Sequence, residues 1–244
     1  MKDIITLIND FIHIFEGMET VPYIGDGYCL KGRFDFRAEH SLCPIVEDVF
    51  ELEILIPSKF PKDLPLVKEI GGRIPRNSDF HINYDDTICL GSPLSLAIYL
   101  SNKSSLVDFA FEVIIPYLYA VTLKLKYDRD FIFGELAHGA KGLYQDYSGI
   151  FGLIDNSQIL QAFECLIVKK RLANKKQCPC GCGNRLGRCT YRFKINNLRK
   201  TLFMKKIRQI YYEYKFNHLG SRYIDRNENR GGHAFNRSHR FRCI

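Results

Sequence analysis

The chain has 244 residues, of which 46% are apolar and 13% aromatic, so it can bury a core and is not intrinsically disordered. Its longest uncharged apolar run, 113–123, is shorter than the roughly 20 residues of a membrane helix, and no basic-then-apolar leader opens the sequence. We therefore expect a soluble cytoplasmic protein.

The net charge of +8 is unevenly distributed along the chain. Residues 169–244 hold 21 Lys and Arg against 3 acidic residues, whereas residues 1–168 hold 14 Lys and Arg against 24 acidic residues. This basic arm either folds back onto the acidic body, binds an anionic partner, or is a solvated surface.

The N-terminal half predicts a helix followed by an antiparallel meander. Apolar residues recur at helical spacing over residues 3–16. Three β-rich stretches, separated by turn residues, follow at 28–36, 49–57 and 66–75. In the second stretch, apolar residues alternate with Glu51 and Glu53, which is typical of a strand with one face in the core.

Beyond residue 90 the pattern becomes helical. Ser105 and Asp108 predict a capped start for an apolar helix, which Pro116 should kink. Further helices are predicted at 157–170 and 197–216. The last stretch, 226–244, has few apolar anchors and several basic residues, so we expect a mobile tail.

Residues 81–90, HINYDDTICL, place His81, Asn83 and Cys89 in one short loop. They follow the strand FELEILIP and a turn that contains Phe60-Pro61 and Leu64-Pro65. This order resembles the ubiquitin-conjugating enzymes, specifically their divergent bacterial members. Ile82 stands where the family has proline, the loop is two residues shorter than the common pattern, and the chain has no tryptophan. These departures favour the bacterial branch.

The resemblance implies an α+β fold over residues 1–150 and a thioester-carrying Cys89. Asn83 would stabilise the oxyanion when an amine attacks, or would fix the loop by hydrogen bonding. His81 would belong to the catalytic site, or would pack and hydrogen-bond, and Asp85 or Asp86 would orient the incoming amine or form the turn. The segment FGELAHG resembles bacterial relatives, and its His138 would face the Cys89 pocket or be structural.

The loop chemistry suits a thioester carrier better than a protease. A thiol has an unperturbed pKa of about 8.5, and Asp85 and Asp86 would raise it further if they lie close. A cysteine protease needs the opposite. Exchange between two thiols is nearly balanced in energy, and an activated carrier brings its own driving force.

The segment CPCGCGNRLGRCT predicts a structural zinc site. Cys178, Cys180 and Cys189 resemble the SEC-C motif, in which Thr190 here occupies the position of the last ligand. Cys182 is the natural fourth ligand, and a tail histidine is the second possibility; the alternative is a site that has degenerated through loss of its last ligand. A segment this short cannot bury a core, so metal binding would supply its folding energy.

The resulting organisation is a conjugating-like domain at 1–150, a linker helix at 151–175, a zinc motif at 176–192 and a basic helix with its tail at 193–244. The function expected from the resemblance is transfer of a ubiquitin-like protein, or another protein C-terminus, from Cys89 to an amine. It implies an activating enzyme, or a route that bypasses one, and a target with a lysine or other amine, in a bacterial anti-phage or conflict system. Two alternatives are an inactive adaptor of the same fold and a cysteine hydrolase pairing Cys89 with His138.

Overall fold

A computed structural model describes residues 3–40, 43–127, 129, 131, 139–221 and 242–243. The chain divides into two compact units. The sheet unit comprises residues 1–90, 103–135 and 233–244, and the helical unit comprises 91–102 and 136–232. The predicted boundary at residue 150 falls inside helix α5, Gly139–Phe151.

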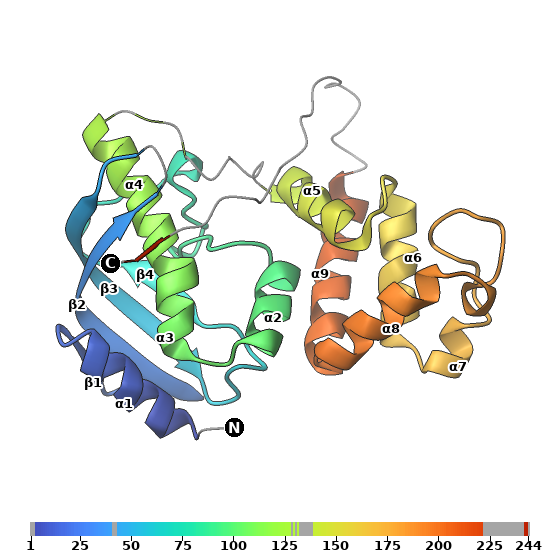
Figure 1. The fold of residues 1–244 in the computed structure, drawn as a ribbon, viewed down its shortest axis with the longest axis horizontal. Coiled ribbons are helices and arrows are strands. Elements are labelled where there is room, and N and C mark those ends of the chain that lie inside the picture. Colours follow the sequence, from blue (N-terminus) through green and yellow to red (C-terminus); the bar gives the residue numbers. More distant parts are fainter. Residues whose placement is uncertain are drawn as a thin grey trace. The chain divides into compact units, whose positions relative to one another are not determined.

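The sheet unit has an N-terminal helix and an antiparallel sheet in the order β1-β2-β3-β4 (Figure 1). Its elements are α1 Ile4–Ile14, β1 Met18–Val21, β2 Gly27–Glu39, β3 Val46–Pro57 and β4 Leu66–Glu69. A helix then runs through α3 Leu106–Phe109, a π-helical segment Ala110–Ile114 and α4 Ile115–Tyr127. The predicted mixed class, with an N-terminal helix, an antiparallel sheet and C-terminal helices, is confirmed at this level.

One face of the sheet forms the core of this unit. The even-numbered residues of β2 and β3 point into it in register, with Leu30 opposite Ile54 and Phe34 opposite Phe50. Helix α4 contacts β2 and β3 on this face, the rings of Phe11 and Phe15 lie beside Phe34, and α1 packs against α3 (Figure 1). The alternation predicted for residues 49–57 is confirmed, because its even-numbered members are the buried ones: Phe50, Leu52, Ile54 and Ile56.

The helix after residue 105 begins as predicted, since the Ser105 hydroxyl accepts a hydrogen bond from the amide of Asp108. Just before Pro116 the helix widens into the π-helical segment, which accommodates a residue that cannot donate a backbone hydrogen bond. By length and composition alone, Leu106–Tyr127 would suffice to cross a membrane, but 67% of its most apolar window is buried, as in the core helix of a soluble protein.

The helical unit consists of α2 Pro93–Asn102, α5, α6 Asn156–Ile167, α7 Lys170–Ala173, α8 Tyr191–Thr201 and α9 Met204–Ser221. Aromatic packing organises its core: the Phe163 ring centroid lies 5.4 Å from that of Tyr147 and 5.0 Å from that of Phe151. Helix α2 contacts α5, α8 and α9. The helical unit is thus formed by two separate stretches of the chain, 91–102 and 136–232, with residues 103–135 of the sheet unit between them.

Several predicted elements differ from those observed. The strand expected at 66–75 ends at Glu69, because Gly72 adopts a φ of +74° and turns the chain. The helix expected at 197–216 is two helices, α8 and α9, separated by an extended residue, Leu202. Of the predicted tail, Arg242–Cys243 forms a short strand, β5, paired with Ala38 and Glu39 of β2, and residues 226–241 and 244 lie outside the described residues.

Candidate functional site

The Cys89 loop, defined as residues 81–89, is a tight antiparallel hairpin. Its two arms pair through an isolated bridge between Ile82 and Ile88. On one side of this bridge the amide of Cys89 donates to the carbonyl of His81 at 2.7 Å, and on the other the amide of Asn83 donates to the carbonyl of Thr87 at 2.8 Å. The hairpin therefore makes His81 and Cys89 cross-strand neighbours, with Asn83 closer to the turn.

A second backbone contact ties the loop to the sheet. The amide of Ile88 donates to the carbonyl of Val67, in β4, at 2.7 Å, and the Ile88 side chain is buried. The thiol of Cys89 is half-buried at the end of this anchored segment. A hydrogen-bonded backbone immediately before the cysteine limits the positions that its thiol can reach.

The side chain of Asn83 is engaged inside the loop. Its Nδ2 donates to the hydroxyl of Thr87 at 2.9 Å, and that hydroxyl in turn donates to the Asp85 carboxylate at 2.6 Å. The Thr87 hydroxyl, followed by other hydrogen bonds, lowers the pKa of Asp85 against the opposing effect of burial. This geometry gives Asn83 the loop-fixing contact, and the same amide group carries a second N–H that can serve as a donor.

Asp86 lies at the turn of the hairpin. Its φ of +64° is left-handed, a conformation that Asp tolerates better than most residues. Its carboxylate lies 3.4 Å from the guanidinium of Arg76, which also donates to the carbonyl of Glu69. Much of the negative charge that the sequence places in the loop is thus already compensated by Arg76 and by the Thr87 hydroxyl.

His81 packs against an aromatic ring. It also has a left-handed φ of +56°, ending a short 3-10 turn, Ser78–Phe80. Its ring meets that of Phe131 edge-on, with centroids 4.7 Å apart. His138, the other histidine expected near Cys89, lies outside the described residues.

Two residues of α4 support the loop, and sequence patterns carried no functional signal for either. Tyr117 donates its hydroxyl to the carbonyl of Phe80 at 2.7 Å. Burial raises the pKa of Tyr117, and the nearby charges of Cys89 and Glu69 raise it further, so its hydroxyl stays protonated and remains a donor. Lys124 donates to the carbonyl of Asp79 at 3.0 Å.

Tyr84 was missed by sequence reasoning. It is fully exposed at the tip of the loop, between Asn83 and Asp85. A large aromatic side chain that is not buried against the described part of its own chain is a typical contact residue for a partner. The available signal was its position inside the cysteine loop, five residues before Cys89.

Four cysteine side chains of the helical unit converge on one point. The sulfur atoms of Cys178, Cys180, Cys182 and Cys189 all lie within 4.8 Å of one another, and Cys180 Sγ lies 3.2 Å from Cys178 Sγ and 3.6 Å from Cys189 Sγ. These separations are far beyond a disulfide bond of about 2.05 Å. They are close to the roughly 3.8 Å between sulfurs in a tetrahedral site with metal–sulfur bonds of about 2.3 Å. The cluster could hold a metal ion.

Local backbone geometry brings these four thiols together. Gly181 and Gly183 both have a left-handed φ, at 79° and 77°, which allows the chain to reverse around Cys182. The amide of Cys178 donates to the carbonyl of Asn184, closing this reversal at 2.8 Å. Cys189 follows a 3-10 turn, Leu186–Arg188, and accepts a hydrogen bond from the amide of Tyr191 at 3.4 Å.

The cysteine segment is joined firmly to the helices around it. Lys176 pairs with Glu164 of α6 at 2.8 Å, and the Tyr191 hydroxyl donates to the carbonyl of Phe151 at 2.8 Å. Leu186, which lies between Cys182 and Cys189 in the sequence, is buried. The segment is therefore an internal part of the helical unit, whereas the sequence predicted an appendage.

Comparison with models of known protein families, with curated proteins and with solved structures found no match. The Cys89 loop and the four-cysteine cluster are therefore the features of the molecule from which a function can be inferred.

Proposed function

We propose that the protein is a ubiquitin-conjugating-like transferase that carries a ubiquitin-like protein as a thioester on Cys89. The observation that carries this proposal is the Cys89 loop itself. Cys89, a half-buried residue, follows an antiparallel meander, and its backbone is hydrogen-bonded to His81 in a loop that also holds Asn83. This arrangement is what the resemblance to bacterial conjugating enzymes leads one to expect of a carrier cysteine.

The proposed reaction has two balanced steps. In the first, the Cys89 thiolate attacks the thioester carbonyl of an activated carrier, and the thiolate of the activating enzyme leaves and takes up a proton. In the second, a neutral amine of the target attacks the Cys89 thioester, the amide bond forms, and the Cys89 thiolate leaves while the amine proton passes to solvent. The first step exchanges one thioester for another and needs no oxidant or nucleotide at this chain.

The loop supports this chemistry mainly by holding the Cys89 thiol in place, and less by acid–base catalysis. The anchored backbone holds the thiol at one place on the surface, which lowers the entropic cost of bringing two protein termini together. Asn83 is two residues from the His81–Cys89 pair, where an amide N–H can stabilise charge on the carbonyl oxygen during aminolysis. Tyr84, exposed beside it, is suited to contact the carrier or the target.

For the four-cysteine cluster we propose zinc in a structural role. A set of four thiolates without an open position favours Zn²⁺ held in a closed tetrahedron, which stabilises the fold and performs no reaction. The residues that would hold it are Cys178, Cys180, Cys182 and Cys189. The hydrogen bond from the Asn184 backbone amide, together with neighbouring thiols, lowers the pKa of Cys182 to about 7, which favours a thiolate at the exposed edge of the cluster.

The carrier is best identified by trapping it. Cys89→Lys, expressed in the cells that make the protein naturally, should accumulate a stable isopeptide adduct, because an amide replaces the labile thioester. Mass spectrometry of the purified protein would then identify the adduct and its attachment site. Cys43→Lys is the matched control, since Cys43 is also a half-buried cysteine of the sheet unit.

The results distinguish the transferase from the two alternative functions. An adduct on residue 89 that the Cys43→Lys control lacks supports the carrier role, and its mass identifies the partner. An inactive adaptor of the same fold would give no adduct with either variant while still co-purifying with its partner. A cysteine hydrolase would give no adduct and would lose peptide-bond or ester cleavage in Cys89→Ala.

A further inference from the structure

The helical unit carries a strong excess of positive charge. Residues 91–102 and 139–221 hold 16 Lys and Arg against 4 Asp and Glu. The ion pair between Lys176 and Glu164 neutralises only a small part of this excess. Polyanions are attracted to such a surface at a distance, and the attraction decreases with salt.

Helix α9 combines this charge with exposed aromatic rings. Lys205, Arg208, Tyr212 and Phe216 are spaced by three or four residues and so lie on one side of the helix, where Tyr212 is 61% and Phe216 79% exposed. The opposite side of the helix is buried in the unit, through Ile207, Ile210, Tyr211 and Tyr214. The aromatic and basic residues therefore share the outward face.

Helix α8 repeats the combination. It has four basic residues and no acidic residue. Phe193 is 61% exposed, and the guanidinium of Arg192 lies over its ring, 4.5 Å from the centroid. Lys200, two turns further along the helix, is exposed on the same side as Phe193.

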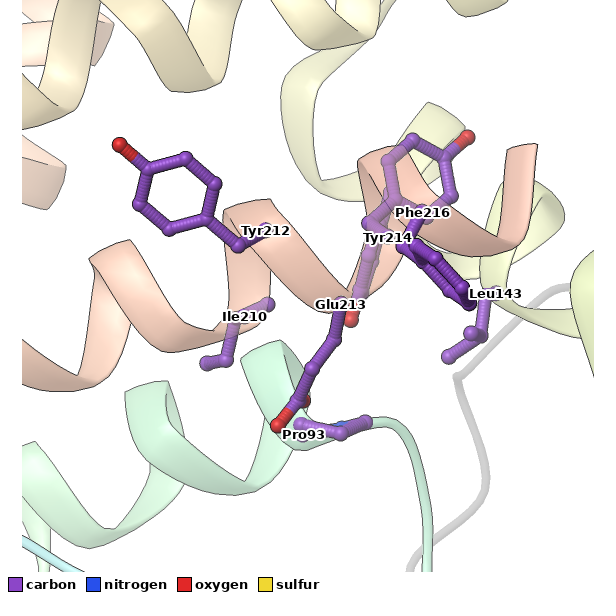
Figure 2. A pocket seen from close by; sticks show the side chains of 8 residues that line it. Pro93, Leu143, Ile210, Tyr212, Glu213, Tyr214 and Phe216 are labelled. Atoms are coloured by element: carbon purple, nitrogen blue, oxygen red, sulfur yellow. The ribbon is translucent and has the colours of Figure 1, made fainter. Parts of the chain in front are cut away.

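A hollow of about 550 Å³ lies beside the exposed aromatic residues of α9. Figure 2 shows its lining residues, which come from α2, α5 and α9 within the helical unit: Pro93, Leu143, Tyr147, Ile210, Tyr212, Glu213, Tyr214 and Phe216. Tyr212 and Phe216 thus belong both to the hollow and to the outward basic face. The hollow is mainly aromatic and apolar, and its one carboxylate, that of Glu213, can accept a hydrogen bond from the amino group of a base.

We propose that the outward faces of α8 and α9 bind single-stranded nucleic acid. Unpaired bases would stack on Phe193, Tyr212 and Phe216, and the phosphates would contact neighbouring Lys and Arg side chains. Paired bases cannot offer their faces to these rings, so duplexes should bind less well. This proposal is independent of the chemistry at Cys89.

The distribution of residues on α9 argues against a lipid surface as the partner. A helix that lies in a membrane interface turns a broad apolar face toward the lipid and a charged face toward water. In α9 the broad apolar face points into the protein, and the outward face mixes Lys205, Arg208 and Glu213 with two aromatic residues. Such a face suits a ligand that alternates flat rings with charged groups.

The proposal can be tested with the full-length, metal-loaded protein and a fluorescent oligouridylate of about 20 nucleotides, which exceeds the roughly 4–16 nucleotides that one such site contacts. Fluorescence anisotropy should show binding that weakens as salt increases. Lys205→Gln with Arg208→Gln should reduce the logarithmic salt slope by about 0.7 for each phosphate that is no longer neutralised. Tyr212→Ala with Phe216→Ala should weaken binding by at least roughly 30-fold and leave the slope unchanged.

Two variants serve as controls. Lys31→Gln with Lys59→Gln removes two exposed charges from the sheet unit and should change neither affinity nor slope. Phe193→Ala tests stacking on α8 independently, so a folding defect in the α9 variants would not decide the outcome. Circular dichroism and metal content identify any variant that is misfolded.

Three results would overturn the proposal. The first is no binding of the oligouridylate at low salt. The second is unchanged affinity in well-folded Phe193→Ala and Tyr212→Ala/Phe216→Ala proteins, which would reduce the interaction to nonspecific charge. The third is tighter binding to a duplex of the same length, to polyglutamate, or to vesicles that contain phosphatidylserine.

Discussion

The amide of Cys89 donates a hydrogen bond to the carbonyl of His81, 2.7 Å away, and this pair closes the hairpin that presents the thiol. The histidine therefore contributes through its backbone, while its ring packs on Phe131. A substitution at His81 by a residue that tolerates the left-handed φ of +56° should leave the closing hydrogen bond in place. His81 is thus a positioning residue in this geometry, and the chemistry is expected to depend on Cys89 and Asn83.

If Cys89 is the carrier, replacement of its thiol should change the bond that is formed. Incubation with an activating enzyme and the carrier identified by the Cys89→Lys trap should give a reducing-agent-sensitive adduct on the parent protein. Cys89→Ser should give a slower ester that resists thiol reagents, or no adduct, because a hydroxyl is a weaker nucleophile than a thiolate. Non-reducing gel electrophoresis measures both. If Cys89→Ser formed the same reducible bond at the parent rate, another cysteine would be the carrier.

The roles of Asn83 and Thr87 can be distinguished by the effects of their substitution on the charging of Cys89 and on its discharge to an amine. If Asn83 stabilises the oxyanion, Asn83→Ala should leave the charging of Cys89 largely intact and slow its discharge to amines by roughly 10²-fold. Thr87→Val removes the hydroxyl that Asn83 contacts but keeps the Asn83 amide. It should slow discharge much less.

Single-turnover discharge of the charged protein to free lysine gives both rates. Equal decreases in rate for Asn83→Ala and Thr87→Val, together with equal decreases in thermal stability, would mean that Asn83 only holds the loop.

Removal of one cysteine should release the metal. The purified protein should carry close to one zinc ion per chain, and Cys182→Ser should lower this content markedly, because one of four ligands is removed. Elemental analysis by mass spectrometry measures the zinc content, and Cys43→Ser is a control in the other unit. Full occupancy in Cys182→Ser would show that the fourth ligand lies elsewhere.

The ionisation of Asp48, in β3, should make the free energy of unfolding depend on pH. Burial opposes its ionisation, but hydrogen bonds from Arg73, from the amide of Val49 and from Lys126 outweigh burial and lower the pKa of Asp48 from 3.8 to about 2. Because this pKa is lower in the folded state, the carboxylate stabilises the fold above about pH 4, and the contribution disappears as the pH falls through about 2.

Asp48→Asn should therefore lower the free energy of unfolding by about 2 kcal/mol at pH 7 and by much less at pH 2. Urea unfolding at the two pH values measures the difference. Asp35→Asn, on the exposed part of β2 and 3.8 Å from Arg33, should cost under roughly 0.5 kcal/mol at either pH. A pH-independent decrease in Asp48→Asn would assign its effect to packing.

Truncation after Gly152 tests how far the sheet unit stands alone. The fragment retains the whole meander and α1, so the sheet should form. It lacks α8 and α9, which contact α2, so part of the buried apolar face of α2, which includes Leu94 and Leu100, should become exposed. We expect a folded but aggregation-prone fragment, in which Leu94→Ser with Leu100→Ser improves solubility. Size-exclusion chromatography and circular dichroism distinguish this result from an unfolded fragment.

Periodicity and capping predicted the local structure well where one face of an element is buried. The alternation in residues 49–57 and the Ser105 cap are both found, because each depends on residues close in sequence. The break between α8 and α9 was missed because Leu198, Leu202 and Ile207 continue an apolar pattern across it. Tertiary packing decides such a break, and a pattern of apolar residues does not register it.

For the four-cysteine cluster, the sequence indicated which residues come together, and for the Cys89 loop it did not indicate the contacts that hold the loop. The spacing of the cysteines predicted a cluster, and the four sulfur atoms do converge. The contact of Asn83 with Thr87 and the support from Tyr117 depend on hydrogen bonds between chosen rotamers and on residues 37 positions apart, as for Tyr117 and Phe80. Neither the Asn83–Thr87 contact nor the support from Tyr117 produces a residue spacing that can be recognised in a single sequence.

Helix α2 belongs to the helical unit but precedes the other helices of that unit in the chain. This order has a consequence for synthesis on the ribosome. Helix α2 leaves the ribosome long before α5, α8 and α9, its partners in the helical unit. Until they follow, its apolar side chains have no partner within that unit, whereas strands β1–β4 already have theirs. Domains generally fold as units during synthesis, and apolar surface exposed in the interval promotes misassembly. Residues 93–102 are thus a segment of the nascent chain that a chaperone would protect until α5, α8 and α9 have been made.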